Sequence, residues 1–281
     1  MTVQTAPRPL DGVHDLLQAR YRDSASVTEQ PWNDILATLL SHRSVRAYRP
    51  EPLPEGSLER IIAAAQSAAT SSNLQTWSVI AVEDTERKVR LSDWAGGQKH
   101  VRECPLFLVW VADLARAEHI AAQRGISLDG LPYLDTLLVA VIDAALAAQN
   151  AVVAAESLGL GAVYIGALRN RLEQVATELQ LPRHAIPVFG LCLGYPDPES
   201  PADIKPRLEP TAILHREHYS LDGQTEAADR YDDRLRGFQR EQGLDPVGWI
   251  SHLLGRLQGA KSLNGRETIL ATIRARGLGL R

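Results

Sequence analysis

The stretch His42-Arg43-Ser44-Val45-Arg46 concentrates cationic and hydroxyl side chains in one short run of an otherwise acidic chain. Two later stretches also carry basic residues: Tyr164-Ile165-Gly166-Ala167-Leu168-Arg169-Asn170 and Lys205-Pro206-Arg207-Leu208. Arginine supplies planar, permanently charged donors that match phosphate, and lysine supplies a point charge. A single basic cluster is usually solvated surface, but the combination has the composition needed to hold a phosphate and an electron-rich ring.

The overall composition is that of a soluble globular protein with one substantial core. The chain has 281 residues, of which 44% are hydrophobic and 23% charged, and its formal net charge is -4. This charge argues against a general nucleic-acid surface or a polybasic membrane patch. No run approaches the roughly 18 uninterrupted apolar residues of a membrane span, and the first residues lack the apolar core of a signal peptide. We expect a cytoplasmic protein with no nucleic-acid or membrane partner.

The two cysteines, Cys104 and Cys192, each lie in an apolar run without metal-ligand spacing. Buried free thiols are therefore expected, with no metal site, and they suit a reducing cytoplasm. The glycines Gly159, Gly161 and Gly166 do not form a dinucleotide-binding fingerprint, because the strand follows them instead of preceding them.

Residues 1–30 are predicted to form an N-terminal arm with one short helix over residues 13–21. Apolar residues at helical spacing predict a second helix over residues 32–40, which ends just before His42. A helix is therefore expected to deliver the basic cluster.

Residues 46–54 contain three prolines and cannot be helical, because proline fixes φ and favours an extended preceding residue. In an extended run, residues two apart share a face. His42, Ser44 and Arg46 can then converge on one ligand.

Four short apolar runs, rich in β-branched or aromatic residues, predict one central sheet. They cover residues 77–82, 105–111, 161–165 and 186–193. Ser57 is expected to cap a helix over residues 58–68.

Residues 134–158 form a long alanine-rich segment that predicts a strong helix, stopped by Gly159 as a C-terminal cap. Its small, apolar face is more than one subunit surface should expose. A packed or dimeric role is therefore the natural inference.

The basic stretches, with Ala95-Gly96-Gly97-Gln98-Lys99-His100-Val101 between them, resemble the nitroreductase superfamily in order and spacing. The resemblance covers residues 40 to 220 and favours the branch of NADPH-dependent nitroreductases and flavin reductases. It implies an α+β fold with a central mixed sheet of about four to five strands flanked by helices. It also implies an intertwined homodimer with FMN at the interface. The implied division is an N-terminal arm (1–30), an FMN-binding core (31–220) and a C-terminal arm that wraps the partner subunit (221–281).

The resemblance also assigns roles to individual side chains. Arg46 would lie toward the N1 and O2 edge of the flavin, where a cation stabilises negative charge. The residues implied around the phosphate are His42, Arg43, Ser44, Lys205 and Arg207. Those implied around the ring and ribityl chain are Thr70, Ser72, Gln98, His100, Tyr164, Ile165, Gly166 and Ala167.

Two further residues are implied to contact substrates. Asn73 replaces the aromatic residue usual in the family, which alters the substrate wall above the flavin. Arg240 matches one arginine that meets the 2′-phosphate of NADPH, but Asp245-Pro246 occupies the next basic position. NADPH is therefore only slightly favoured over NADH or dual use.

Together these features predict an FMN-dependent oxidoreductase that transfers hydride from NAD(P)H to nitroaromatics, quinones or free flavin. One site would serve both substrates, so ping-pong kinetics are expected, with flavin N5 carrying the hydride and no side chain acting as a nucleophile. Two alternatives stay open: another FMN enzyme of the same fold, such as a reductive dehalogenase, and a non-catalytic flavin-binding protein.

Overall fold

A computed structural model describes residues 12–22 and 32–281 of the chain. Its backbone contacts form two compact units. The first unit joins the chain up to Arg43 to Ala202–Ser262, and the second joins Ser44–Pro201 to Leu263–Arg281. Of the predicted N-terminal arm, residues 1–11 and 23–30 lie outside the described residues, and the division into arm, core and C-terminal arm stays a prediction.

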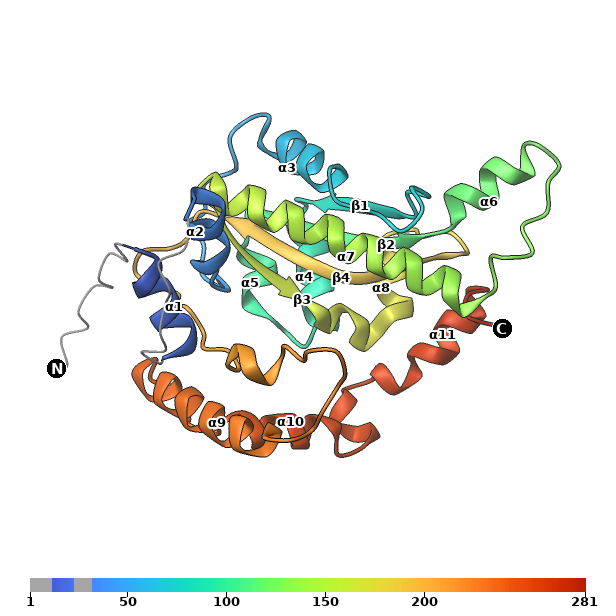
Figure 1. Ribbon diagram of the computed structural model, residues 1–281. Helices are drawn as coiled ribbons and strands as arrows, with labels where there is room; N and C mark the ends of the chain where they lie inside the picture. Colours follow the sequence, from blue (N-terminus) through green and yellow to red (C-terminus); the bar gives the residue numbers. More distant parts are fainter. Residues whose placement is uncertain (1–11, 23–31) are drawn as a thin grey trace. The chain divides into compact units, whose positions relative to one another are not determined.

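The second unit holds a four-stranded sheet (Figure 1). Its strands are β1 (Trp77–Val82), β2 (Leu106–Asp113), β3 (Gly161–Ile165) and β4 (Ala185–Gly194), in the order β1-β2-β4-β3. The accompanying helices are α3 (Ser57–Gln66), α4 (Thr85–Trp94), α5 (Lys99–Glu103), α6 (Ala115–Ala122), α7 (Leu134–Ser157), η1 (Gly166–Arg171), α8 (Leu172–Glu178), η4 (Arg266–Thr268) and α11 (Ile269–Ala275).

The α+β class and the four strands agree with the sequence prediction, but the strand pairing differs from the expected mixed sheet. All three pairings among the named strands are antiparallel. Parallel pairing in the described residues is confined to an isolated bridge between Ser44 and Ala162. The apolar pattern of a strand is the same in either direction, so it reports burial and not pairing direction.

Both faces of the sheet are covered. Alternate residues of β2 point to opposite sides and pack in two different cores. Leu108 and Trp110 pack in a core with α3 and α7, whereas Phe107 and Val109 pack in a second core with α4 and α5. Figure 1 shows α7 running along the first of these faces. Burial on both sides explains why the β2 sequence is continuously apolar.

The long helix α7 is strongly apolar and is a core element. Within the described ranges it is the one helix long and apolar enough to cross a membrane by length and composition, with a mean hydropathy of 1.9, although no such span was expected. It nevertheless packs on all four strands and on α3, as a core helix of a globular protein does. Gly159 follows it in the left-handed conformation, which confirms the predicted C-terminal cap.

The first unit is built from helices that precede residue 44 and helices that lie within residues 202–262. They are α1 (Val13–Tyr21), α2 (Asp34–Leu40), η2 (Pro210–Ala212), α9 (Gln224–Glu241) and α10 (Trp249–Leu257), and η3 (Ala260–Leu263) follows them. Tyr231, Leu235 and Phe238 of α9 form a small core with Leu208 and Trp249.

One predicted helix start was wrong. Ser57 lies inside α3 and makes no capping bond, and Gly56 precedes the helix at φ 78°. Both cysteines are buried free thiols, as predicted, and burial raises the pKa of Cys192 well above its ordinary value.

Candidate functional site

The first unit brings the two basic segments together around a buried arginine of α1. Arg20 is only 7% exposed. Its guanidinium donates to the carbonyls of Lys205 (2.9 Å), Leu40 (3.0 Å) and His42 (2.9 Å). The backbone N–H of Arg207 donates in turn to the carbonyl of Arg20 (2.9 Å). Segments that are distant in sequence thus meet on one helix.

The side chains of these segments provide the donor types that phosphate needs. Arg43, Lys205 and Arg207 are exposed, and His42 is half-buried. The Arg207 guanidinium donates to the carbonyl of Pro206 (3.1 Å), which also accepts a hydrogen bond from the buried hydroxyl of Tyr231 (3.0 Å). Burial raises the pKa of Tyr231, and the charge of Arg207 opposes that rise. The segment 205–207 is therefore anchored to α9.

In the second unit, an extended segment continues from Ser44 along β3. Ser44 bridges Ala162, and the N–H of Val45 donates to the carbonyl of Ala162 (3.0 Å). The Tyr48 hydroxyl donates to the carbonyl of Val45 (2.6 Å). A Cβ on Gly161 would lie 2.6 Å from the Val45 side chain, so glycine permits this close approach. The predicted absence of helix after residue 46 is confirmed.

Arg46 and His100 interact electrostatically in the second unit. Burial lowers the pKa of His100, and the charge of Arg46 lowers it further. The Nε2 atom of His100 is buried and has no hydrogen-bond partner within residues 12–22 and 32–281. Such an unpaired buried atom is uncommon in folded proteins. Gln98 precedes α5, and its carbonyl accepts from the hydroxyl of Ser92 (2.9 Å).

The end of β3 is held by aromatic and cationic contacts. The ring of Tyr164 meets Phe189 edge to face, with 5.1 Å between centroids, and burial raises the pKa of the Tyr164 hydroxyl. Arg169 donates to the carbonyl of Val188 (2.6 Å), and a Cβ on Gly166 would lie 3.3 Å from its guanidinium. The other predicted residues of this stretch are the buried Ile165 and the half-buried Ala167.

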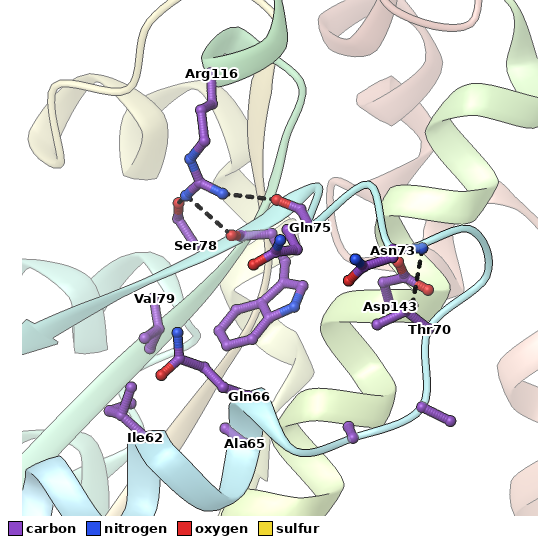
Figure 2. A pocket seen from close by; sticks show the side chains of 13 residues that line it. Ile62, Ala65, Gln66, Thr70, Asn73, Gln75, Ser78, Val79, Arg116 and Asp143 are labelled. Carbon is purple, nitrogen blue, oxygen red and sulfur yellow. Dashed lines mark hydrogen bonds between the residues drawn. The ribbon is translucent and has the colours of Figure 1, made fainter.

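Thr70 and Asn73 line a cavity of about 540 Å³, shown in Figure 2. The Asn73 N–H donates to the Thr70 hydroxyl (3.0 Å), and the Ser71 N–H donates to Oδ1 of Asp143 on α7 (3.0 Å). Asp143 is 1% exposed, and its Oδ2 is buried without a partner in the described part of the chain. The predicted ring-edge residue Ser72 is exposed in the same loop.

Other polar residues of this cavity were missed from the sequence, among them Gln75, Arg116 and Asp143. Arg116 donates to the carbonyl of Gln75 (2.6 Å) and to the hydroxyl of Ser78 (2.6 Å), as Figure 2 shows. Asn73 and Gln75 both have positive φ, 53° and 52°. The signal that could have found Asp143 is a lone carboxylate within the apolar face of the predicted helix.

The structure does not bring the loop of residues 70–73 to His100 within one chain. The loop is held by α7, on the sheet face that carries Leu108 and Trp110. The helix α5, which carries His100, packs on the opposite face through Val101. The predicted ring contacts of the second unit therefore fall into two groups.

Comparison with known proteins identifies the family. Residues 39–195 match the Nitroreductase family, and residues 205–281 match the Nitroreductase family, C-terminal domain. This chain belongs to the nitroreductase family. The nitroreductase is 39% identical over 227 residues to FMN reductase (NADPH) of Bacillus subtilis (strain 168), covering 79% of this chain and 90% of that protein. It is 43% identical over 220 residues to oxygen-insensitive NADPH nitroreductase of Salmonella typhimurium, covering 76% and 87% of the two chains.

Solved structures agree with this assignment. NfrA1 of B. megaterium superposes with a TM-score of 0.82 at 37% identity, covering 88% of the nitroreductase and 100% of that chain. The NADPH:FMN oxidoreductase of Vibrio harveyi, solved with NAD+, gives a TM-score of 0.78 at 33% identity, with coverages of 89% and 100%. The predicted superfamily and fold class are thereby confirmed.

Arg240, the residue predicted to meet a nicotinamide nucleotide, is exposed in the last turn of α9 of the nitroreductase. Arg236 donates to the carbonyl of Pro246 (2.7 Å) and so fixes the loop that follows. The individual roles of the site residues stay predictions.

Proposed function

We propose that this nitroreductase is an FMN-dependent oxidoreductase that passes hydride from NAD(P)H to nitroaromatics, quinones or free flavin. The observation that carries the proposal is the meeting of two basic segments in the first unit. Arg20 bonds to both, which places His42 and Arg43 on the same unit as Lys205 and Arg207. Relatives whose names state FMN reductase and NADPH nitroreductase activity support the same function.

The residues present fit the phosphate of FMN. Phosphate monoesters carry close to two negative charges at neutral pH, and they bind arginine forks and lysine. Arg43, Lys205 and Arg207 supply these groups, and all three are exposed to an incoming ligand. We assign the phosphate to these three residues, with His42 as a further donor.

The residues also fit the pyrimidine edge of a flavin. Arg46 supplies a permanent cation beside His100, whose Nε2 lacks a partner among the described atoms. Because burial and Arg46 both lower the pKa of His100, the imidazole is neutral at physiological pH and can donate or accept one hydrogen bond there. Arg46 would stabilise negative charge on the ring, and His100 would orient it.

When bound, FMN supplies the hydride-accepting and hydride-donating centre. The loop of Thr70, Ser72 and Asn73 would offer its short polar groups to the ring edge, held in place by Asp143. No side chain needs to act as a nucleophile. Nicotinamide and acceptor would use one site in turn, which predicts ping-pong kinetics.

We further propose that the enzyme is a cytoplasmic homodimer with the flavin at its interface. An apolar stripe on α7, formed by Leu134, Leu138, Ile142 and Leu146, is 42–53% exposed in one chain. Such a stripe on one helix is typical of an interaction surface. A second copy would also allow the loop of one chain to meet the Arg46–His100 pair of the other. The free thiols suit a reducing compartment.

The test is an absorbance spectrum of the purified protein, followed by anaerobic addition of NADPH and, separately, of NADH. We expect the spectrum of oxidised flavin, bleached within seconds by at least one nucleotide and restored by a nitroaromatic or a quinone.

A yellow protein that neither nucleotide bleaches would instead support the non-catalytic flavin-binding alternative. Bleaching without reoxidation by nitroaromatics, quinones or free flavin, but with reoxidation by a halogenated aromatic, would support the dehalogenase alternative. A colourless protein that cannot be loaded with FMN would overturn the proposal.

A further inference from the structure

The described N-terminal helix α1 lies outside both family matches, which begin at residues 39 and 205. It is nevertheless fixed to the first unit. Leu16 is 5% exposed, and Arg22 pairs with Glu241 of α9 (2.6 Å) and lies over the ring of Phe238 (5.2 Å). The chain therefore adds a docked helix to the segments that it shares with its family.

The one buried arginine of α1 points its guanidinium at main-chain carbonyls of the two basic segments. Arg20 bonds to the carbonyls of Leu40 and His42 on one side and to that of Lys205 on the other. The N–H of Arg207 returns a bond to the carbonyl of Arg20. A guanidinium is planar and holds its N–H donors in a fixed geometry, so it can fix the positions of several acceptors at once. The single ammonium group of a lysine lacks this geometry.

The carbonyls of His42 and Lys205 belong to residues to which the proposed function assigns the phosphate, and the carbonyl of Leu40 lies two residues before His42. A phosphate site requires its cations to be in place before binding, because ordering them on binding costs conformational entropy. Arg20 does not present its own charge as an exposed group, since it is 7% exposed. Its contacts act on the backbone that carries His42, Arg43, Lys205 and Arg207.

We propose that Arg20 is a positioning residue that holds these two segments in the arrangement that binds the phosphate of FMN, so that α1 is part of cofactor binding in this chain. This inference rests on the proposed phosphate site. It gives a role in cofactor binding to α1, a helix that lies outside both family-matched segments.

The experiment compares the binding of FMN and riboflavin to flavin-free full-length protein, by quenching of flavin fluorescence. Riboflavin lacks the phosphate, so the dissociation constant of riboflavin divided by that of FMN measures the phosphate contribution. A variant that loses phosphate binding lowers this ratio. The variants are Arg20→Ala and Arg20→Lys, of which the second keeps the charge but loses the planar fork. We expect FMN binding to weaken by about tenfold or more in both, with riboflavin binding unchanged.

The matched control is Arg22→Ala, which removes a charge from the same helix without touching either basic segment. It should leave the ratio unchanged. A thermal melt of each flavin-free variant separates a local effect from unfolding. If Arg20→Ala does not fold, Arg20→Lys decides the question. If Arg20→Lys loses riboflavin and FMN binding equally, or leaves the ratio unchanged, the positioning role is wrong.

The double variant Arg43→Ala/Arg207→Ala distinguishes this inference from the function on which it rests. If the double variant lowers the ratio and the Arg20 variants do not, only the role of Arg20 fails. If the double variant also leaves the ratio unchanged, the phosphate lies elsewhere, and the proposed site and the role of Arg20 both fail.

Discussion

Arg240 is the residue on which the choice between NADPH and NADH is predicted to depend. It is exposed at the end of α9, ahead of the acidic Asp245. A guanidinium that contacts the 2′-phosphate acts only on NADPH, because NADH lacks that group. We therefore expect Arg240→Ala to raise the KM for NADPH by about tenfold and to leave the KM for NADH nearly unchanged, measured by steady-state kinetics.

Removal of the nearby negative charge of Asp245 provides a check on this prediction. Asp245→Asn removes a carboxylate and should lower the KM for NADPH modestly. Equal effects of Arg240→Ala on both nucleotides would remove the assignment to the 2′-phosphate.

Residues whose signal is local could be proposed from the sequence, and residues whose contacts are distant in sequence could not. His42, Arg43 and Lys205 stand in short basic runs, and composition alone singled them out. Arg20 bonds to a carbonyl 185 residues away, and nothing in its neighbourhood in the sequence points there. Asp143 was read as one more position of an alanine-rich helix, although its carboxylate holds the loop at residue 71.

Among the elements, α10 begins in an unusual way, because a residue of another helix caps it. Oδ1 of Asp232 on α9 accepts from the N–H of Ile250 (2.7 Å), and its Oδ2 accepts from Arg236 (2.7 Å). Burial alone would raise the pKa of Asp232, but these hydrogen bonds outweigh it and lower the pKa below its ordinary value.

The lowered pKa predicts how the stability of this helix pair depends on pH. A carboxyl with a lower pKa in the folded state stabilises the fold above its unfolded pKa of about 3.9, and this stabilisation is lost as the pH falls through the folded value. At pH 7 we expect Asp232→Asn to lower the free energy of unfolding by about 1 kcal/mol. The difference from wild type should begin to close as the pH falls below about 3.9, the ordinary pKa of the unfolded carboxyl, measured by urea unfolding. The exposed neighbour variant Asp233→Asn should show no such convergence, and a gap that persists at low pH would contradict the charged cap.

The glycine before α10 gives a second prediction for the same element. Gly248 has φ +80°, and a Cβ there would lie 2.5 Å from Oδ1 of Asp232. Gly248→Ala should therefore destabilise the protein by about 1–3 kcal/mol, measured by thermal or urea unfolding. The control is Gly255→Ala within α10, where a Cβ meets nothing within 4 Å and helix propensity favours alanine. Equal effects of the two substitutions would rule out the clash with the cap.

The elements themselves were largely predictable, because period and composition are properties of a segment. The runs at 77–82 and 161–165 coincide with β1 and β3. Ser57 misled because a serine before an apolar helical pattern is a common cap, whereas the α3 backbone turns one residue earlier, at Gly56. Pairing direction was misjudged because it depends on how distant segments meet.

For the whole molecule, the stripe on α7 predicts the oligomeric state. Leu138→Lys/Ile142→Lys places two charges on the stripe, where burial against a second copy would be strongly unfavourable. We expect the proposed homodimer to become a monomer in analytical ultracentrifugation, with loss of bound FMN if the flavin lies at the interface.

A matched substitution elsewhere tests whether the effect is specific to the stripe. Ile120→Lys changes an apolar residue of α6 that is 45% exposed, and it should leave the dimer intact. A wild-type protein that sediments as a monomer, or a dimer that survives both charges on α7, would contradict this interface.

The family and the fold class could be predicted at this scale because the motifs recur in order along the chain. The division into two units could not, since each unit joins two segments that are separated in the sequence by a part of the other unit. The association of such separate segments depends on contacts like those of Arg20, and no local sequence pattern predicts these contacts.

The discontinuous first unit has a consequence for the protein during its synthesis. His42 and Arg43 leave the ribosome early, but Lys205 and Arg207 follow only after the whole sheet has been translated. A nascent chain that stops before residue 202 contains all four strands and α7 but lacks Lys205 and Arg207 of the proposed phosphate site. Cofactor capture by the growing polypeptide would therefore mark near-completion of translation, and abortive products would stay colourless.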